Sequence, residues 1–157
     1  MRVIAIDPGV TTGYCYAAIV DGVLLYCPFQ AADDVEDFWE RLAMFKPQHI
    51  IMEDFEFRGG ARKGLELFPV QLIGIANLYS MKTGKPLYLQ GAGDGKSYYT
   101  DNILKQRELY IRGIPHGMDA SRHLLQWATF KRGYELVPKS VFRLVPMERF
   151  DLGAKKL

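Results

Sequence analysis

The sequence predicts a mixed α/β domain built on one five-stranded sheet, in which three antiparallel strands are followed by parallel strands and helices flank the sheet. Two observations predict this class. An apolar run at residues 3–6 is followed by two further extended runs, which are joined by an Asp-Gly pair typical of a hairpin turn. Beyond them, helical spacing alternates with short β-branched runs, the order that gives parallel strands joined by helices.

The composition is that of an ordinary globular protein. Of its 157 residues, 48% are hydrophobic and 24% are charged, which is sufficient for one core. No apolar run approaches the ~20 residues of a membrane span, and the amino terminus lacks the layout of a signal peptide. We therefore expect a cytoplasmic protein with no membrane partner. Acidic residues gather at 33–40 and basic ones follow residue 58, which is compatible with a basic face for a polyanion and equally with solvated surface charge.

The first strand ends in a carboxylate. Residues 3–6 are apolar and rich in β-branched side chains, which favours a buried strand. Asp7 follows directly, and Pro8 and Gly9 then predict a turn. An acid held at the end of a buried strand is suited to binding a metal ion or a phosphate, provided that other carboxylates converge on it.

The predicted hairpin has arms at residues 14–20 and 23–30, with the Asp-Gly pair at its tip. Cys15 and Cys27, the two cysteines of the chain, fall on these two arms. A disulfide between them is geometrically conceivable, but in a reducing compartment we expect two buried thiols.

A helix is expected to follow the hairpin. Asp33 or Asp34 would cap it, and Pro47 would end it. Its predicted buried stripe consists of Val35, Phe38, Trp39, Leu42 and Ala43.

The helix leads to a second strand-end acid. Residues 49–52 form a short apolar run, followed by Glu53 and Asp54. Because this strand is reached through a helical crossover, it should run parallel to the first strand. Glu53 would then lie at the same sheet edge as Asp7, and two acids brought together by topology are more informative than two acids in the sequence.

The remaining elements follow from periodicity and stop signals. Pro69 and Pro115 each mark the start of a regular helix, since proline is favoured in the first helical turn. The predicted elements are a mobile loop over 55–64, a helix over 65–82, a strand over 86–90, a glycine loop over 91–96 and helices over 97–109 and 115–132. Their expected buried faces are Leu72, Ile75, Ala76 and Tyr79 in the first helix and Ala120, Leu124, Trp127 and Ala128 in the last.

Acids in the first strand, the fourth strand and the final helix predict a two-metal site for phosphodiester hydrolysis. Such a reaction requires an activated water and a stabilised leaving oxygen, and two hard cations about 3.5–4 Å apart supply both. Carboxylate oxygens are the natural ligands of Mg²⁺. Asp7 would bridge two Mg²⁺ ions, with Glu53 and Asp119 each completing one side.

Each of these residues also has a simpler interpretation. Asp7 could bond its own turn, and Asp119 could oppose the helix dipole. Asp54 could replace Glu53, because strand alternation alone does not decide between them. His116 lies three residues before Asp119 and shares a helix face with it, so it is a candidate metal ligand or proton carrier, or has a capping or surface role. His123, four residues after Asp119, is expected to be packed or on the surface.

Three motifs resemble those of the RuvC-type Holliday junction resolvases, which have the RNase H-like fold. Ile6-Asp7-Pro8-Gly9 with Thr12-Gly13-Tyr14 resembles the opening of that family, Met52-Glu53 its second acidic motif, and His116-x-x-Asp119-Ala120 its last. The resemblance spans most of residues 3 to 130. It implies a metal-dependent homodimer that nicks branched DNA symmetrically, without a nucleotide cofactor.

The resemblance also has departures. His116 stands where bacterial members have an acid, which softens the site and favours Mn²⁺ as a substitute for Mg²⁺. The glycine loop is shorter than in bacterial members, so only Lys96 matches a family lysine. A compact, divergent member suits a bacteriophage, which would place the protein in the host cytoplasm. The resemblance implies a nuclease domain over residues 1–132. The remaining residues, 133–157, match no part of the family and are expected to be an extension that packs on this domain or trails from it.

The resemblance implies DNA contacts around the loop that follows the second acid. An aromatic side chain there would wedge into the junction centre. Phe57 could equally be a core residue, and the basic residues of the loop could equally be solvated surface charges. The helix over 65–82, with Gly74, would form the dimer contact. The expected DNA-binding residues are Phe55, Phe57, Arg58, Arg62, Lys63 and Lys96.

Three rival functions remain at this stage. One is a nuclease of broader specificity that cuts flaps, forks or RNA–DNA hybrids. Another is an actin-like ATPase, which also has an Asp at its first strand but needs a second, duplicated domain. The third is a junction-binding protein that no longer cuts, and the presence of Asp7, Glu53 and Asp119 argues against it.

Overall fold

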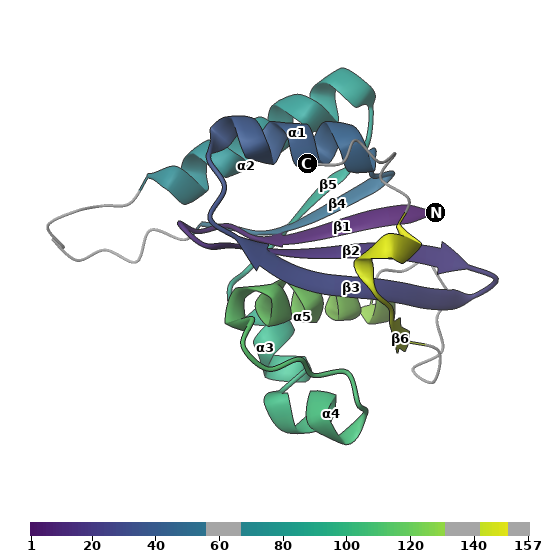
Figure 1. Ribbon diagram of the computed structural model, residues 1–157. Coiled ribbons are helices and arrows are strands. Elements are labelled where there is room, and N and C mark those ends of the chain that lie inside the picture. The colour runs from purple at the N-terminus through teal and green to yellow at the C-terminus, as the bar shows by residue number, and fades with distance from the viewer. Residues whose placement is uncertain (56–66, 131–141, 151–157) are drawn as a thin grey trace, which may run out of the picture.

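A six-stranded sheet runs through the molecule in the order β5-β4-β1-β2-β3-β6, with helices on both faces (Figure 1). The computed structural model describes residues 1–55, 67–130 and 142–150. In this part of the chain the strands are β1 (Arg2–Asp7), β2 (Thr12–Val20), β3 (Val23–Ala31), β4 (His49–Glu53), β5 (Leu87–Gln90) and β6 (Phe142–Leu144). The helices are α1 (Val35–Phe45), α2 (Phe68–Thr83), α3 (Asp94–Tyr98), α4 (Asp101–Gln106) and α5 (Pro115–Phe130), and a 3₁₀ turn spans Met147–Arg149.

The predicted hairpin of β2 and β3 is confirmed. Asp21 and Gly22 have φ values of 49° and 75°, the two positive angles that a tight type I′ turn requires. Cys15 and Cys27 are both free thiols, as expected, but only Cys15 is buried, whereas Cys27 is partly exposed. They lie on adjacent rungs of the hairpin and belong to the clusters on opposite faces of the sheet, which explains why no disulfide forms between them.

β4 runs parallel to β1, as the helical crossover predicted, with Ile6 beside Met52. Val3, Ala5 and Ile51 lie in the core on the α5 side of the sheet, whereas Ile6 and Met52 lie in the core under α1 and α2. Because side chains alternate along a strand, the residues that follow Ile6 and Met52 face α5. The register therefore directs Asp7 and Glu53 toward the same helix, and the next residue along, Asp54, is exposed.

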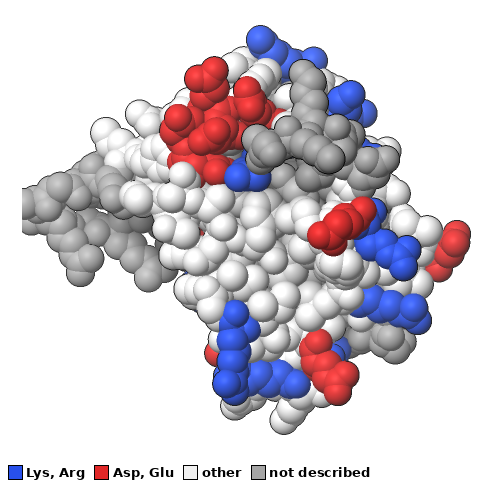
Figure 2. Space-filling view, in the orientation of Figure 1, with Lys and Arg blue, Asp and Glu red and all other residues white. Residues whose placement is uncertain are grey.

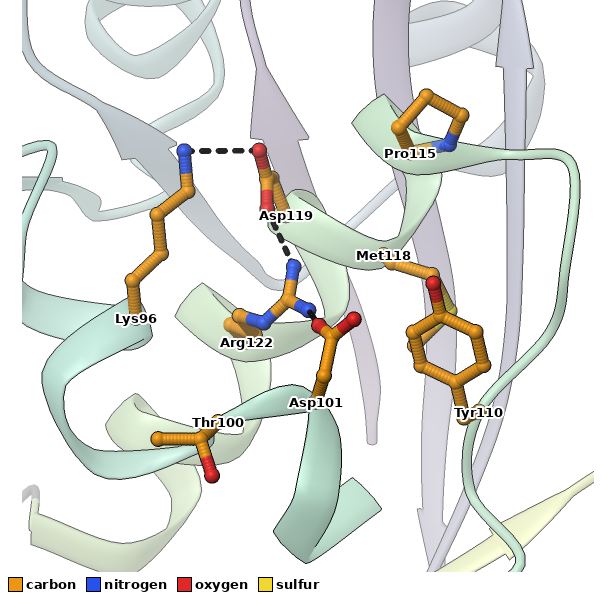
Figure 3. A pocket seen from close by; sticks show the side chains of 8 residues that line it. All are labelled: Lys96, Thr100, Asp101, Tyr110, Pro115, Met118, Asp119 and Arg122. Atoms are coloured by element: carbon orange, nitrogen blue, oxygen red, sulfur yellow. Dashed lines mark hydrogen bonds and ion pairs between the residues drawn. The ribbon is translucent and has the colours of Figure 1, made fainter. Parts of the chain in front are cut away.

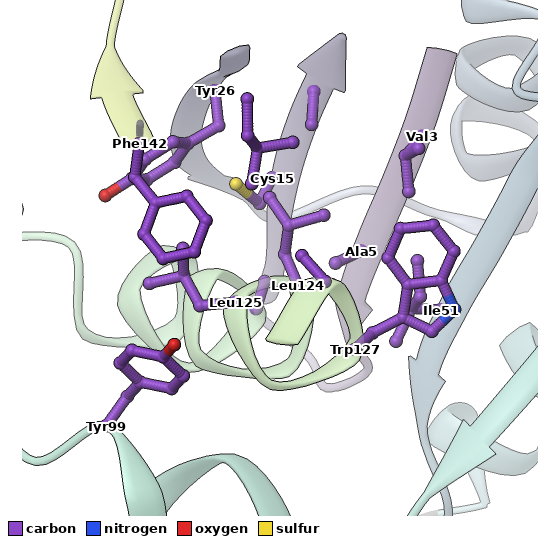
Figure 4. Packing of buried hydrophobic residues seen from close by; sticks show 14 of the residues in the cluster. Val3, Ala5, Cys15, Tyr26, Ile51, Tyr99, Leu124, Leu125, Trp127 and Phe142 are labelled. Carbon is purple, nitrogen blue, oxygen red and sulfur yellow. The ribbon is translucent and has the colours of Figure 1, made fainter. Parts of the chain in front are cut away.

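α5 lies across one face of the sheet and is buried along nearly its whole length. All four residues of its predicted stripe are buried. Figure 4 shows Leu124, Leu125 and Trp127 packed against side chains of β1, β2 and β4 and against Phe142 from β6. Such dense packing holds the helix rigidly relative to the strand ends.

α1 and α2 cover the opposite face (Figure 1). α2 begins at Phe68 and places Pro69 in its first turn, as predicted. α1 begins at Val35 and ends before Pro47, also as predicted, and Asp34 is its cap. The predicted stripe of α1 is wrong at both ends. Its first and last members are exposed, because the helix turns Phe45 into the core instead.

Asp33, the other candidate cap, is buried in a polar network. Its carboxylate accepts hydrogen bonds from the Tyr14 hydroxyl at 2.7 Å and from Arg41 Nη2 at 2.9 Å. Burial raises the pKa of Asp33, but the hydrogen bonds from Arg41 and Tyr14 outweigh burial, so that its pKa lies below the ordinary value. Tyr14, from the opening motif, therefore has a structural role in joining β2 to α1.

Replacing Asp33→Asn is expected to lower the free energy of unfolding by about 1–3 kcal/mol at pH 7, because Arg41 loses a buried charged partner. Since the pKa of Asp33 is lower in the folded state, its contribution is present above about pH 4 and is lost as the pH falls through the folded-state value. Urea denaturation at pH 7 and pH 3 should thus show a difference between variant and wild type that shrinks in acid. An equal difference at both pH values would assign the effect to shape rather than charge.

The single helix predicted over 97–109 is wrong. The structure has two short helices, because Thr100 adopts an extended conformation and its side chain caps α4 by accepting from the Ile103 main-chain nitrogen. α3 also begins earlier than expected, at Asp94, whose carboxylate accepts from the Gly91 main-chain nitrogen at 2.9 Å. Lys96 accordingly lies on α3 rather than in a glycine loop.

The predicted count of five strands is also wrong. β6 is the sixth strand and runs parallel to β3, so that residues in the irregular tail extend the sheet. The strand is short and follows a long connection, which left no periodic signal in the sequence. Phe142 enters the core on the α5 side, and Phe150 enters the core on the other side.

Acidic side chains gather over α1, on the sheet face opposite α5 (Figure 2). Exposed acids at residues 34, 36, 37 and 40 form this group. Among the described residues, no helix is both long enough and apolar enough to cross a membrane.

Candidate active site

The opening motif builds a rigid strand end around Asp7. Thr12 is fully buried, and its hydroxyl donates to the Gly9 main-chain oxygen at 2.8 Å, which closes the turn between β1 and β2. Asp7 pairs with Gly13 across the two strands. The Asp7 side chain is only 12% exposed, so a short, well-ordered turn holds a nearly buried carboxylate.

Gly13 allows the first turn of α5 to lie directly on β2. A Cβ atom added at Gly13 would lie 2.0 Å from the His116 main-chain oxygen, far inside contact distance. Gly117 lies just as close to β3, since a Cβ atom added there would lie 2.6 Å from the Phe29 main-chain oxygen. This backbone contact brings His116 and Asp119 to the ends of the strands and gives the glycine of the Thr-Gly-Tyr motif its physical reason.

His116 contacts Asp7, as the motif suggested. Its Nδ1 atom lies 3.0 Å from Asp7 Oδ2, and its side chain is 46% exposed. Its main-chain nitrogen donates to the side-chain oxygen of Gln30 on β3 at 3.1 Å, which satisfies one of the unpaired donors at the start of α5. The histidine is therefore positioned from both sides.

Asp119 contacts two cations (Figure 3). Lys96 Nζ lies 2.8 Å from Asp119 Oδ2, and Arg122 Nη1 donates to the other oxygen, Oδ1. Arg122 is buried and also donates to Asp101 and, through Nε, to the Tyr99 main-chain oxygen at 2.9 Å. Beside this group lies a cavity of about 430 Å³ lined by Lys96, Thr100, Asp101, Tyr110, Pro115, Met118, Asp119 and Arg122.

Glu53 contacts a buried histidine. Its Oε2 atom lies 2.9 Å from His123 Nε2. The other ring nitrogen, Nδ1, lies 2.7 Å from the side-chain oxygen of Gln90 at the end of β5. His123 is fully buried, so of the two expected states, packed or on the surface, it is packed. Both of its ring nitrogens contact side chains at strand ends.

The electrostatics of the site show that its acids share one environment. The pKa of Asp7 is raised from 3.8 to about 6. Burial is the largest cause, the charges of Glu53 and Asp119 add to the increase, and the hydrogen bond to His116 opposes it. Partial burial lowers the pKa of Lys96, but Asp119, Glu53 and Asp7 together outweigh it and raise the pKa. Negative charge is therefore concentrated here without full compensation.

The acids are turned toward basic neighbours. Across residues 1–55, 67–130 and 142–150, no three His, Cys, Asp or Glu side chains are grouped as the ligands of one metal ion. Asp7 faces His116, Asp119 faces Lys96, and Glu53 faces His123. Binding of a divalent cation would require at least the exposed Lys96 side chain to leave Asp119.

The structure places two of the predicted DNA-binding residues. Lys96 is paired with Asp119, and Phe55 lies partly exposed just beyond β4. The others, Phe57, Arg58, Arg62 and Lys63, lie outside the described residues.

Sequence reasoning missed Gln90, Asp101 and Arg122 and gave His123 no role. Gln90 could have been found by the rule that found Glu53, because it ends a parallel strand at the same sheet edge. Arg122 and Asp101 meet only through the packing of α3 and α4 on α5, for which the sequence carries no local signal.

Comparison with solved structures shows a shared fold. The chain superposes on Thermus thermophilus RuvC in complex with a Holliday junction substrate with a TM-score of 0.62, at 19% sequence identity over 85% of this chain and 98% of that one. The fold is that of RuvC. The T. thermophilus RuvC structure gives a TM-score of 0.60 at 20% identity, covering 84% and 96% of the two chains. The fowlpox virus Holliday junction resolvase gives 0.56 at 11% identity, covering 82% and 99%.

The fold predicted from the motifs, RNase H-like and similar to RuvC, is thus confirmed. No protein-family model and no curated protein sequence matched the chain.

Proposed function

We propose that this protein is a metal-dependent endonuclease that resolves four-way DNA junctions by paired symmetric nicks. One observation carries the proposal. Asp7, Glu53 and Asp119 come from three separate elements and lie near enough that the charges of Glu53 and Asp119 each raise the pKa of the buried Asp7, in a fold shared with RuvC bound to a Holliday junction. Two-metal hydrolysis of phosphodiesters places its cations in such a cluster of acids.

The donor set fits a hard divalent cation. Asp7, Glu53 and Asp119 offer carboxylate oxygens, which Mg²⁺ prefers, and His116 adds a nitrogen that Mn²⁺ accepts readily. The raised pKa of Asp7 reflects repulsion and burial, which a bound cation would relieve. Two Mg²⁺ ions held by these residues would supply an activated water and a stabilised leaving oxygen.

The other residues have roles that follow from their positions. Lys96, with a half-exposed side chain on Asp119, would turn to a DNA phosphate once a cation replaced it. Arg122 would keep Asp119 in place during this exchange, because it is buried and bonded on three sides. His116 would use its exposed ring to take or give a proton beside Asp7.

A homodimer would account for paired nicks, since a four-way junction and a C₂ dimer share two-fold symmetry. α2 supports this proposal because it carries apolar side chains on its solvent side as well as its core side. Exposed among them are Val70, Leu78 and Met81, at 43%, 45% and 83%, and Leu67 just before the helix is 55% exposed. Specificity would come mainly from junction shape and phosphate contacts, with base preference secondary.

The test is cleavage of a synthetic four-way junction labelled in turn on each strand, beside a flap, a fork, an RNA–DNA hybrid and linear duplex. We expect symmetric ligatable nicks in opposite strands of the junction in Mg²⁺ or Mn²⁺. Chelation by EDTA should abolish cleavage and leave junction binding measurable by gel shift, because the phosphate contacts do not require the metal.

Other outcomes would change the proposal. Equal cutting of flaps or forks would indicate a branched-DNA nuclease of broader specificity, and preferred cutting of the hybrid a nuclease of RNA–DNA duplexes. Junction binding without cleavage in either metal would leave a binding protein.

A further inference from the structure

We infer that His123, held by Gln90, is a positioning residue that fixes Glu53 for metal binding. The inference rests on the proposed function, because it takes Glu53 to be a ligand of the catalytic cation. It concerns a contact between the middle of α5 and the ends of two parallel strands, β4 and β5, which no motif in the sequence includes.

The orientation of the Gln90 side chain is set by a second contact. Its amide nitrogen donates to the main-chain oxygen of His123 at 3.3 Å, which leaves its amide oxygen toward the ring. His123 Nδ1 lies 2.7 Å from that oxygen and must carry a proton to donate to it. The ring is thereby held at one nitrogen, and its rotation is fixed.

The other ring nitrogen faces Glu53. Nε2 lies 2.9 Å from Glu53 Oε2, within hydrogen-bond distance. The His123 side chain is 1% exposed, whereas that of Glu53 is 18% exposed. The histidine is closed off from solvent, so Oε2 is contacted from inside the protein, while the Glu53 side chain as a whole keeps some exposure.

Simple core packing does not account for this residue. Leu124 and Leu125 follow His123 on α5 and are fully buried apolar residues, so an aliphatic side chain would suit the interior without a desolvation cost. The buried imidazole instead contacts the polar side chains at the ends of two neighbouring strands. Such outer partners orient a ligand, and their loss lowers metal affinity by about 10–100-fold.

The experiment measures Mn²⁺ binding to the full chain by the free-Mn²⁺ signal in electron paramagnetic resonance. We expect His123→Leu to weaken Mn²⁺ binding about 10–100-fold and His123→Gln, whose amide can still donate to Glu53, to restore most of it. Junction cleavage should follow the same order in kcat, with KM for the junction unchanged.

Ser121→Ala is the matched control. Ser121 is a fully buried polar residue on the same helix, and its hydroxyl donates to the Gly117 main-chain oxygen at 2.9 Å and lies 3.5 Å from Cys15 Sγ. Ser121→Ala should lose about as much stability as His123→Leu in urea denaturation, yet bind Mn²⁺ like the wild type.

The outcomes separate this inference from the proposed function. Equal Mn²⁺ binding by His123→Leu and wild type, or equal weakening in the Ser121→Ala control, would overturn the positioning role and leave the nuclease proposal standing. If His123→Leu does not fold, Gln90→Leu replaces it, because this variant removes the contact that holds the His123 ring, and Mn²⁺ binding by Gln90→Leu equal to that of the wild type would overturn the positioning role in the same way. Absence of both Mn²⁺ binding and cleavage in the wild type would overturn both.

Discussion

Asp7→Asn is expected to reduce junction cleavage by about 100-fold or more and, in the presence of EDTA, to make the protein more stable at pH 8. The two effects have one cause. Asp7 is nearly buried beside two other acids, which raises its pKa to about 6. Asparagine keeps the shape and removes the charge, and with the charge it removes a carboxylate that we propose holds the catalytic cation.

The sign of the stability change follows from linkage. Because the pKa of Asp7 is higher in the folded protein than in the unfolded chain, folding is favoured most while Asp7 is protonated, below about pH 4. That stability is lost as the pH rises through 6, and the total loss in the free energy of unfolding is about 3 kcal/mol. Asp7→Asn should therefore unfold at higher urea concentration than wild type at pH 8 and at nearly the same concentration at pH 4.

Asp54→Asn is the control for both measurements. Asp54 follows Glu53 at the same strand end but is exposed, so its replacement should change cleavage by less than about two-fold and stability by less than about 0.5 kcal/mol. Cleavage by Asp7→Asn at the wild-type rate would remove Asp7 from the catalytic group. Equal stability of Asp7→Asn and wild type at pH 8 would show that neither burial nor the neighbouring acids disfavour the charged form of Asp7 in the folded protein.

The acids of β1 and β4 could be placed from the sequence because local rules decide their positions. β-branched runs, an Asp-Gly turn and a helical crossover together specify two parallel strand ends, and Asp7 and Glu53 follow those strands. The sequence favoured Glu53 over Asp54 only through the resemblance to a family motif. The pairing of Ile6 with Met52 gives the physical reason, because it shows which face each residue occupies.

The partners of the acids could not be predicted in the same way. His123 reaches Glu53 across 70 residues, and Arg122 reaches Asp101 through the docking of α3 and α4 on α5. Neither contact has a sequence period or a turn signal. The sixth strand was missed for the same reason, since three residues after a long connection carry too little pattern to be distinguished from a loop.

The close contact between β2 and α5 gives the second large effect. Gly13→Ala is expected to lower the free energy of unfolding by more than about 3 kcal/mol, beyond the usual range for an added methyl group. The new Cβ would lie 2.0 Å from the His116 main-chain oxygen and 2.2 Å from the carbon that carries it. These are backbone atoms, so no side chain can rotate to make room, and α5 must move away from the sheet.

Such a movement would also separate His116 and Asp119 from Asp7, because the contact lies at the first turn of the helix that carries both. Urea denaturation followed by circular dichroism measures the loss, and a variant that is unfolded without urea meets the expectation. Gly93→Ala is the matched control, since its φ of −86° suits alanine and nothing lies within 4 Å of the added atom. If Gly13→Ala were as stable as Gly93→Ala, α5 would not lie against β2 as described, and the geometry of the acidic cluster would have to be rebuilt.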